Sequence, residues 1–286
     1  MTRAGGKRAT APAAAGATEE LRVQWPDSGI AVLTFDRPAQ LNALTDASVA
    51  ALARALDALA ADTALRALVI TGAGRAFCAG FDLALAADAP LARELGSEAA
   101  AWTARQEAFA GIVTRLRSLR APVIAAVDGP ASGAGLGIAL ACEIRLASPA
   151  ATFNAAFVKV GMSSCDIGVS WLLPRCIGSS RAFEIMLSGR MVAADEAERI
   201  GLVSAVVPQA DLLSGAIETA RRIAAHDAFA VWMTKRGGWA NLEAASLQAA
   251  IELENRTQIL ARSTGALQRA AEQFVSRKGS RAGSRG

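Results

Sequence analysis

Three glycines at alternate positions, Gly133, Gly135 and Gly137, are the residues of this sequence with the clearest potential for chemistry. They follow an apolar, β-branched run at 122–127 and the turn residues Asp-Gly-Pro at 128–130, and they open an Ala- and Leu-rich stretch. This order predicts a strand, a tight turn and a buried helix. The first N–H groups of a helix have no acceptor within the helix, and such a terminus stabilises negative charge. We therefore expect the turn to hold an anion, either a phosphate or an oxyanion that forms during a reaction.

The spacing of these glycines disfavours two familiar kinds of site. The turn reads G-A-G-L-G, one residue short of the G-x-G-x-x-G pattern of dinucleotide-binding proteins, and the G-K-[ST] of a P-loop does not occur in the chain. Ser132 lies in G-P-A-S-G instead of the G-x-S-x-G of serine hydrolases, and the single histidine, His226, lies at the end of an expected amphipathic helix. A nucleotide phosphate and a serine nucleophile are therefore weak interpretations of the turn.

A second glycine-rich loop follows an apolar run at 65–71 that is typical of a buried strand. The loop reads GAGRAFCAGFDL over 72–83, and its glycines allow the backbone to approach another group closely. We therefore expect a second place at which backbone atoms meet a ligand or another segment.

The elements that must position these loops alternate between strand-like and helix-like periods. Two short strands at 21–25 and 30–35 enclose the turn Pro-Asp-Ser-Gly, and Thr45 or Asp46 is expected to cap a helix that runs to about residue 61. The alternation continues to about residue 208 and favours an α/β fold. Further expected elements are a helix ending near 120, strands at 144–147, 152–153 and 202–207, and helices at 167–176, 180–187, 194–200, 212–225, 228–239, 242–262 and 265–277.

These patterns predict one α/β core with an appended helical region. The core is expected over residues 19–208, and a C-terminal helical region over 209–277 is a candidate for subunit contacts. Residues 1–18, rich in Ala, Gly, Thr and Arg, are expected to form a disordered N-terminal tail, and residues 278–286 a basic tail.

Composition narrows the possible partners and cofactors. The formal net charge of +4 comes largely from the two tails, which lack interleaved aromatic residues, so we expect no nucleic-acid partner. No apolar run approaches the roughly 20 residues of a membrane helix, and no secretory signal is present, so we expect a cytoplasmic protein without membrane attachment. Four cysteines without metal-site spacing and a single histidine predict no metal site.

Five segments together carry a specific resemblance. They are AFCAGFDL at 76–83, VDGPASGAGLG at 127–137, RPAQLNAL at 37–44, WLLPRCIGSSRAFEIMLSGR at 171–190 and EAERIGLVSAVVP at 196–208. In sequence and in order they resemble segments of the crotonase superfamily, the enoyl-CoA hydratases and isomerases, over about residues 21–277.

The resemblance implies a crotonase-like spiral of β-β-α units with a C-terminal helical trimerisation region, assembled as a homotrimer or a dimer of trimers. It implies an acyl-CoA substrate, no cofactor other than the coenzyme A of that substrate, and an oxyanion hole for the thioester oxygen made by the backbone N–H groups of Phe81 and Ala134. The other residues that it places at the substrate or coenzyme A are Arg37, Gln40, Leu41, Asn42, Ala43, Ala79, Asp82, Leu83, Gly133 and Phe157.

The acids and bases of the family set the reaction, and this sequence departs from the hydratase pattern. The two glutamates that hydratases use correspond to Gly137 and Phe157, and neither is acidic here. The histidine of aromatic-acyl-CoA dehalogenases falls near Ala110 and is also missing. The remaining acid at a family catalytic position is Asp166, which matches an aspartate used for proton transfer by dienoyl-CoA isomerases; alternatively, it caps the helix that follows.

The interpretation that fits best is double-bond isomerisation of an enoyl-CoA thioester, with Asp166 as the acid/base that moves one proton. An enoyl-CoA hydratase or lyase of fatty-acid degradation, using another group or an activated water, is the leading alternative. A crotonase-fold protein that has lost catalysis and serves as a binding subunit is a third possibility, because both hydratase acids are missing.

Overall fold

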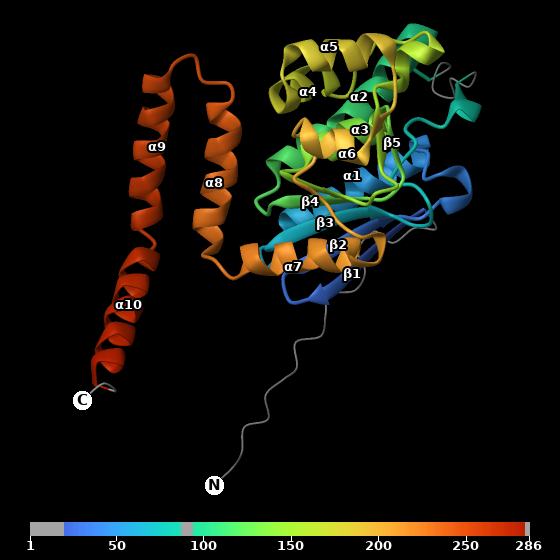
Figure 1. Cartoon of the computed structure of the whole chain (residues 1–286). Coiled ribbons are helices and arrows are strands. Elements are labelled where there is room, and N and C mark those ends of the chain that lie inside the picture. Colours follow the sequence, from blue (N-terminus) through green and yellow to red (C-terminus); the bar gives the residue numbers. More distant parts are fainter. Residues whose placement is uncertain (1–19, 87–93, 284–286) are drawn as a thin grey trace.

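The β-branched and Leu-rich runs of the sequence form a six-stranded sheet in the computed structural model, which describes residues 20–86 and 94–283, with side chains to residue 275 (Figure 1). The strands lie in the order β1 (Leu21–Asp27), β2 (Ile30–Phe35), β3 (Ala67–Gly72), β4 (Val123–Val127), β6 (Ile144–Ala147) and β9 (Ala205–Val206). β1 pairs antiparallel with β2, as expected for the hairpin, and the remaining pairs are parallel.

A second, three-stranded sheet contains β5 (Pro130–Ser132), β7 (Thr152–Asn154) and β8 (Val192–Ala193). The chain passes from β4 in the first sheet to β5 in the second through one tight turn and then enters helix α3 (Ala134–Ala141). It repeats the passage from β6 to β7. These repeated β-β-α turns are the spiral that the resemblance predicts, and they put the end of β5 and the start of α3 at one place.

Alternate side chains of the parallel strands enter two different hydrophobic cores. Leu33, Leu68 and Ile70 contribute to the larger core with helices α1 (Asp46–Ala61) and α2 (Glu98–Ser118). Val32 and Val69 face helix α7 (Leu212–Ala224) on the opposite face of the sheet. This division follows from the two-residue period of a strand. α7 lies in the C-terminal helical region expected from the sequence, yet it covers the sheet, so the part that stands away from the core begins after it (Figure 1).

The α-helices otherwise follow the predicted order. Their bounds are α1 Asp46–Ala61, α2 Glu98–Ser118, α3 Ala134–Ala141, α4 Val169–Ile177, α5 Ser179–Ser188, α6 Ala194–Arg199, α7 Leu212–Ala224, α8 Ala228–Asn241, α9 Leu247–Arg262 and α10 Ala266–Gly283, with short 3-10 helices η1 Pro38–Gln40, η2 Leu83–Leu85, η3 Ala156–Val160 and η4 Gln209–Asp211. Thr45 caps α1 as expected, through its side chain and the N–H of Ser48.

Several predicted bounds are wrong, and two of them concern the start or length of an element in the C-terminal half. The helix expected from residue 242 begins at Leu247, because the side chain of Ser246 accepts the N–H of Ala249 and starts a new helix there. The strand expected over 202–207 shortens to two residues, Ala205–Val206, which pair with β6.

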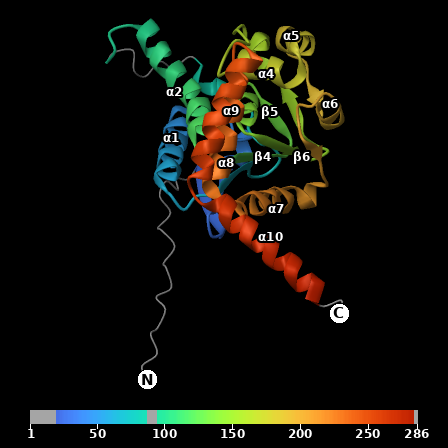
Figure 2. The same cartoon turned by 90° about the vertical axis from the view of Figure 1, so that its left-hand side faces the viewer.

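Helices α8, α9 and α10 form an arm beside the α/β body (Figure 1), and Figure 2 shows α10 leading away from the body. Lys235 and Trp239 of α8 attach the arm, through hydrogen bonds to Leu116, Ala121 and Glu143 of the body. The expected N-terminal tail, 1–18, lies outside the described residues, whereas the backbone of the expected basic tail continues α10 as far as Gly283. Among the described helices, none is long and apolar enough to cross a membrane.

Candidate active site

Two isolated parallel bridges hold the glycine-rich loop at 72–83, one to β5 and the other to the segment at 37–44. Cys78 donates its N–H to the carbonyl of Pro130 (3.0 Å) and accepts from the N–H of Ser132 (3.0 Å), which ties the second loop to β5. Leu44 donates to the carbonyl of Gly80 (2.7 Å) and accepts from the N–H of Asp82 (3.0 Å). In a parallel ladder, a residue flanked in this way directs its own N–H to the opposite side. The N–H of Phe81 therefore points away from Leu44.

The N–H groups of Phe81 and Ala134, which the resemblance assigns to an oxyanion hole, are both available. Neither donates a hydrogen bond within the described part of the chain, and Ala134 is the first residue of α3. Gly80, with φ of +93°, holds the loops in contact: a β-carbon at this position would lie 2.7 Å from the oxygen of Ser132 and 3.3 Å from the nitrogen of Ala134. The structure thus brings two unpaired donors from separate loops to one place.

The loop at 133–137 packs so closely against the loop at 72–83 that two of its positions require glycine. Gly133 has φ of +52°, a region that favours glycine, and its N–H donates to the carbonyl of Asn154 (3.0 Å). A β-carbon on Gly135 would overlap the carbonyl of Cys78, so no side chain fits between the loops. The predicted anion-binding turn is therefore shaped by its packing against the second loop.

Asp166, the candidate acid/base, is half-buried just before α4. Its Oδ1 accepts hydrogen bonds from Nε2 of Gln106 in α2 and from the N–H of Ile167 (2.6 Å), whereas Oδ2 has no partner among the described residues. The alternative that Asp166 caps the following helix is wrong, because the residue before α4 is Gly168 and no side chain caps that terminus.

Two contacts connect Asp166 to the loops that carry the unpaired N–H groups of Phe81 and Ala134. Its neighbour Ile167 packs on Gly137 in the first turn of α3, three residues after Ala134. Gln106 lies one turn from Phe109, whose ring meets that of Phe81 edge to face at 5.6 Å between centroids. A carboxylate with one free oxygen therefore lies beside both loops of the site.

The positions at which hydratases carry glutamates hold no acid, and the structure shows what replaces them. Ile167, with φ of +40°, fills the space in front of Gly137: its Cγ2 lies 2.6 Å from where a β-carbon on Gly137 would stand. Phe157, in η3, places its ring 3.7 Å from the corresponding point on Gly133. Both positions are therefore apolar walls of the site.

The segment at 37–44, which the resemblance places at the substrate, makes structural contacts with the neighbouring loops. Arg37 donates to the carbonyl of Ala43 (2.6 Å) and forms an ion pair with Asp82 (3.2 Å). Asn42, 1% exposed, donates to the carbonyls of Ala73 (2.9 Å) and Ala76 (2.7 Å). Because these side chains bind protein atoms, Arg37 and Asn42 position the loops, and contact of this segment with a substrate stays a prediction.

The remaining expected substrate residues lie on the segment at 37–44 and on the neighbouring loop at 72–83. Leu41 accepts the N–H of Ala79 (3.0 Å), and Asp82 caps η2 through the N–H of Ala84 (3.2 Å). Gln40 and Leu83 are exposed, Leu83 at 59%, so their side chains are accessible at the mouth of the site.

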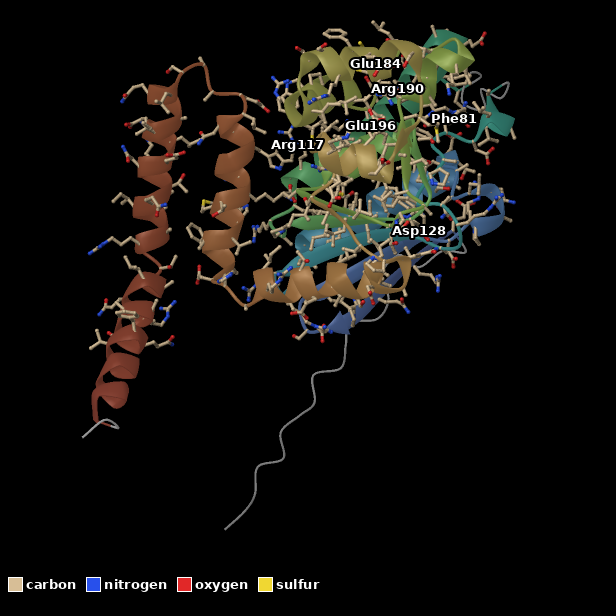
Figure 3. All side chains as sticks on the ribbon, in the orientation of Figure 1. Phe81, Arg117, Asp128, Glu184, Arg190 and Glu196 are labelled. Atoms are coloured by element: carbon tan, nitrogen blue, oxygen red, sulfur yellow. The ribbon has the colours of Figure 1, made fainter. Side chains whose placement is uncertain are left out.

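Gln106 is the site residue that sequence reasoning missed. The sequence could have indicated Gln106, because it lies one helical turn before Ala110 on α2. Ala110 is the position that corresponds to the histidine of the dehalogenases. Figure 3 shows Phe81 on the opposite side of the body from Arg117, which lies nearer the arm. No cluster of three or more potential metal ligands occurs among the residues that the structure describes.

Comparisons with known proteins agree with this geometry. Residues 26–281 match the family described as Enoyl-CoA hydratase/isomerase. The chain is 43% identical over 240 residues to a probable enoyl-CoA hydratase of Mycobacterium tuberculosis, with 84% of each chain covered. Its structure is similar to that of a probable enoyl-CoA hydratase/isomerase of Mycobacterium abscessus, at 40% identity and a TM-score of 0.79, covering 85% of this chain and 90% of that one. It is also similar to a monofunctional enoyl-CoA isomerase of M. smegmatis, at 39% identity and a TM-score of 0.69, covering 82% and 99%.

Proposed function

The chain is an enzyme of the enoyl-CoA hydratase/isomerase family with the crotonase fold, and from that premise we propose that it moves the double bond of an enoyl-CoA thioester. The observation that carries the proposal is the position of Asp166. It is a carboxylate with one free oxygen, beside two loops whose N–H groups are unpaired, where both hydratase glutamates are replaced by apolar residues.

The two N–H groups act on charge that forms during the reaction. When a proton leaves the carbon next to the thioester, the electron pair moves to the thioester oxygen and creates an enolate. Donors already fixed by Phe81 and Ala134 stabilise that oxygen without reorganising, and a lost donor of this kind costs about 3 kcal/mol in comparable sites. The N-terminus of α3 adds its positive end at Ala134.

Asp166 moves the proton. Its free Oδ2 removes a proton from the α-carbon of a 3-enoyl thioester, and the same proton returns to the γ-carbon as the enolate collapses. The double bond then lies between the α- and β-carbons, and no atom is gained or lost. The hydrogen bonds from Gln106 and Ile167 hold Oδ1, so that Oδ2 is the oxygen presented for this transfer. The reaction calls on no cofactor beyond the coenzyme A of the substrate.

The test compares wild type with Asp166→Asn on a 3-enoyl-CoA, following formation of the conjugated 2-enoyl product. The wild-type protein is expected to isomerise the substrate, and the variant to lose about 10²- to 10⁴-fold in kcat, the usual contribution of a positioned general base. An unchanged rate in Asp166→Asn would remove the assigned base.

A second arm offers the 2-enoyl thioester and measures the 3-hydroxy product. We expect hydration to be far slower than isomerisation, because no paired carboxylates hold a water. Hydration at a comparable rate would favour the hydratase alternative, and bound thioester without any turnover would favour a binding subunit.

We propose further that the chain assembles as a homotrimer or a dimer of trimers through its helical arm. Large apolar side chains of α9 and α10 support this, because Leu247 is 77% exposed, Ile259 68% and Phe274 69%. Large apolar side chains exposed along one arm are typical of a surface that binds another protein chain. Sedimentation analysis is expected to give three or six chains for wild type and a smaller species for Ile259→Asp; a monomeric wild type would contradict the proposal.

A further inference from the structure

Arg105 of α2 is a buried cation, with 8% of the residue exposed. Among the described residues the other buried cation is Lys235, which attaches the arm. A charged side chain is costly to withdraw from water unless other groups pair with it. The groups that surround Arg105 therefore indicate what its burial achieves.

The guanidinium of Arg105 lies close to two aromatic rings. Its Cζ is 4.7 Å from the centre of the Trp102 ring and 5.8 Å from that of Phe81, both within the reach of about 6 Å over which a cation is attracted to a ring. Phe109, one turn further along α2, meets the same Phe81 ring edge to face at 5.6 Å between centroids. Two side chains of α2 thus hold the ring of Phe81.

The same guanidinium also holds the start of α1. Its Nη2 lies 2.7 Å from Oδ2 of Asp46, the first residue of that helix. Asp46 follows Leu44 by two residues, and Leu44 forms the parallel bridge with Phe81. Arg105 therefore contacts both sides of this bridge, the ring of Phe81 on one side and the start of α1 on the other.

This bridge sets the direction of the Phe81 N–H. The N–H of Phe81 and the carbonyl of Gly80 belong to one planar trans peptide group, so they point in opposite directions. That carbonyl accepts the N–H of Leu44 at 2.7 Å. Gly80 has no side chain to restrict rotation of the peptide. The direction of the Phe81 N–H consequently depends on the groups that hold Leu44 and Phe81 relative to one another.

We infer that Arg105 is a positioning residue for the oxyanion donor at Phe81, an inference that rests on the proposed function and deepens it. A donor stabilises an enolate oxygen without reorganising only if it already points to the place where the charge forms. A misplacement of about 1 Å can cost 10²-fold in rate. The planar guanidinium suits this role because it can lie against a ring and bind a carboxylate together, whereas an ammonium is a compact point charge.

A second ion pair between α1 and α2 supplies the matched control. The two helices lie side by side (Figure 2), and Arg115 of α2 binds Asp57 of α1 at 3.0 Å. Arg115 follows Arg105 by ten residues, a rise of about 15 Å along the helix. If Arg105 only ties the helices together, loss of either arginine should leave the oxyanion donor unchanged.

The test measures the thioester carbonyl itself. Infrared spectra of bound butyryl-CoA, isotope-labelled at the carbonyl carbon, report how strongly hydrogen-bond donors polarise that bond, and this compound has no double bond to move. On binding to wild type or Arg115→Met, the carbonyl frequency is expected to fall. The fall should be smaller in Arg105→Met.

Turnover of a 3-enoyl-CoA gives the second readout. Arg105→Met should lower kcat about 10- to 10²-fold while KM stays within about twofold, because the donor matters most once charge has formed. Arg105→Lys keeps a cation beside Asp46 without the planar group at Phe81. It should recover the melting temperature of wild type but only part of the carbonyl shift and of kcat.

A folded Arg105→Met with the full carbonyl shift and kcat, or equal losses in Arg115→Met, would overturn the inference. If Arg105→Met does not fold, Asp46→Asn removes the partner charge at a side chain that is 44% exposed, and the same outcomes apply. A wild type that shows the carbonyl shift but does not isomerise would remove the proposed reaction, and the shift in the variants would still decide the role of Arg105. A wild type without any shift would remove the oxyanion site and this role together.

Discussion

Cγ2 of Ile167 lies 2.6 Å, and the carbonyl oxygen of Ile167 2.9 Å, from the point where a β-carbon on Gly137 would stand. A glutamate at position 137 would therefore meet both the side chain and the backbone of the segment that carries Asp166. The contact of Ile167 with Gly137 leaves no room for a glutamate at position 137, and it also holds the segment that carries Asp166.

Gly137→Glu is consequently expected to destabilise the protein and to create no hydratase. Overpacking and a carboxylate pressed against Ile167 together should lower the free energy of unfolding by about 2 to 4 kcal/mol, as measured by denaturant titration. Gly111→Glu in α2 is the control and should destabilise less, because the only side chain close to its β-carbon position is the flexible Arg115. If Gly137→Glu is stable and adds water to a 2-enoyl-CoA faster than wild type, the segment that carries Ile167 moves readily.

Gln106 is expected to act as a positioning residue through Asp166. Gln106→Leu removes its donor to Oδ1 and should lower kcat for isomerisation about 10-fold while KM and the melting temperature stay nearly unchanged, because the hydrogen bond acts on the orientation of the base and not on the binding of substrate. Glu107→Gln, the exposed neighbour, is the control. A matching change in KM, or no change in kcat, would mean that Gln106 does not orient the base.

Lys235 anchors the helical arm and should affect stability with a definite pH dependence. Its Nζ donates to the carbonyls of Leu116 (3.0 Å) and Ala121 (3.1 Å) and lies 3.2 Å from Glu143. Lys235→Met leaves those acceptors buried, and urea unfolding is expected to show a loss of about 3 kcal/mol. Arg256→Met, on the exposed face of α9, should have little effect.

Burial lowers the pKa of Lys235 below its ordinary 10.5, in spite of the nearby Glu143 carboxylate. Between the lowered value and 10.5 the unfolded chain binds more protons at this site than the folded one, so the stability of wild type should rise with pH through that window relative to Lys235→Met. A difference that falls with pH there would contradict the burial of this ammonium.

The cysteines are expected to react in order of exposure. Burial raises the pKa of the Cys78 and Cys142 thiols to about 12, so neither forms a thiolate at neutral pH. Cys165 is exposed. A thiol reagent should therefore label Cys165 first, and Cys165→Ser should remove that fast phase; labelling of Cys78 in the folded protein at the same rate would contradict the assignment.

Arg190 bridges two elements on the outer surface, where Figure 3 shows it with Glu184 and Glu196. Hydrogen bonds from Arg190 lower the pKa of both carboxyls below 4.5. The stability they contribute is complete above 4.5 and is lost as the pH falls through their lowered values. Arg190→Gln should thus lower the melting temperature at neutral pH, and the difference should shrink in acid, unlike that of the exposed Arg54→Gln.

The sequence by itself determined the local elements and the identity of the two loops. β-branched runs predict β2, β3 and β4, and Thr45 predicts the start of α1, because each depends on neighbouring residues only. The motifs around Phe81 and Ala134 identify the family, and the oxyanion hole that the resemblance implies stays a prediction. The absence of acids at Gly137 and Phe157 is likewise readable from the sequence.

Only the tertiary structure decided what surrounds those residues. Ile167 fills the space at Gly137, Gln106 binds Asp166 from 60 positions away, and Arg37 is paired with Asp82 at a distance of 45 positions. Such contacts depend on how segments far apart in the chain are brought together, and hydrophobic periodicity carries no information about which polar groups then meet. The role of Asp166 as a held carboxylate instead of a helix cap is therefore a property of the fold, not of its local sequence.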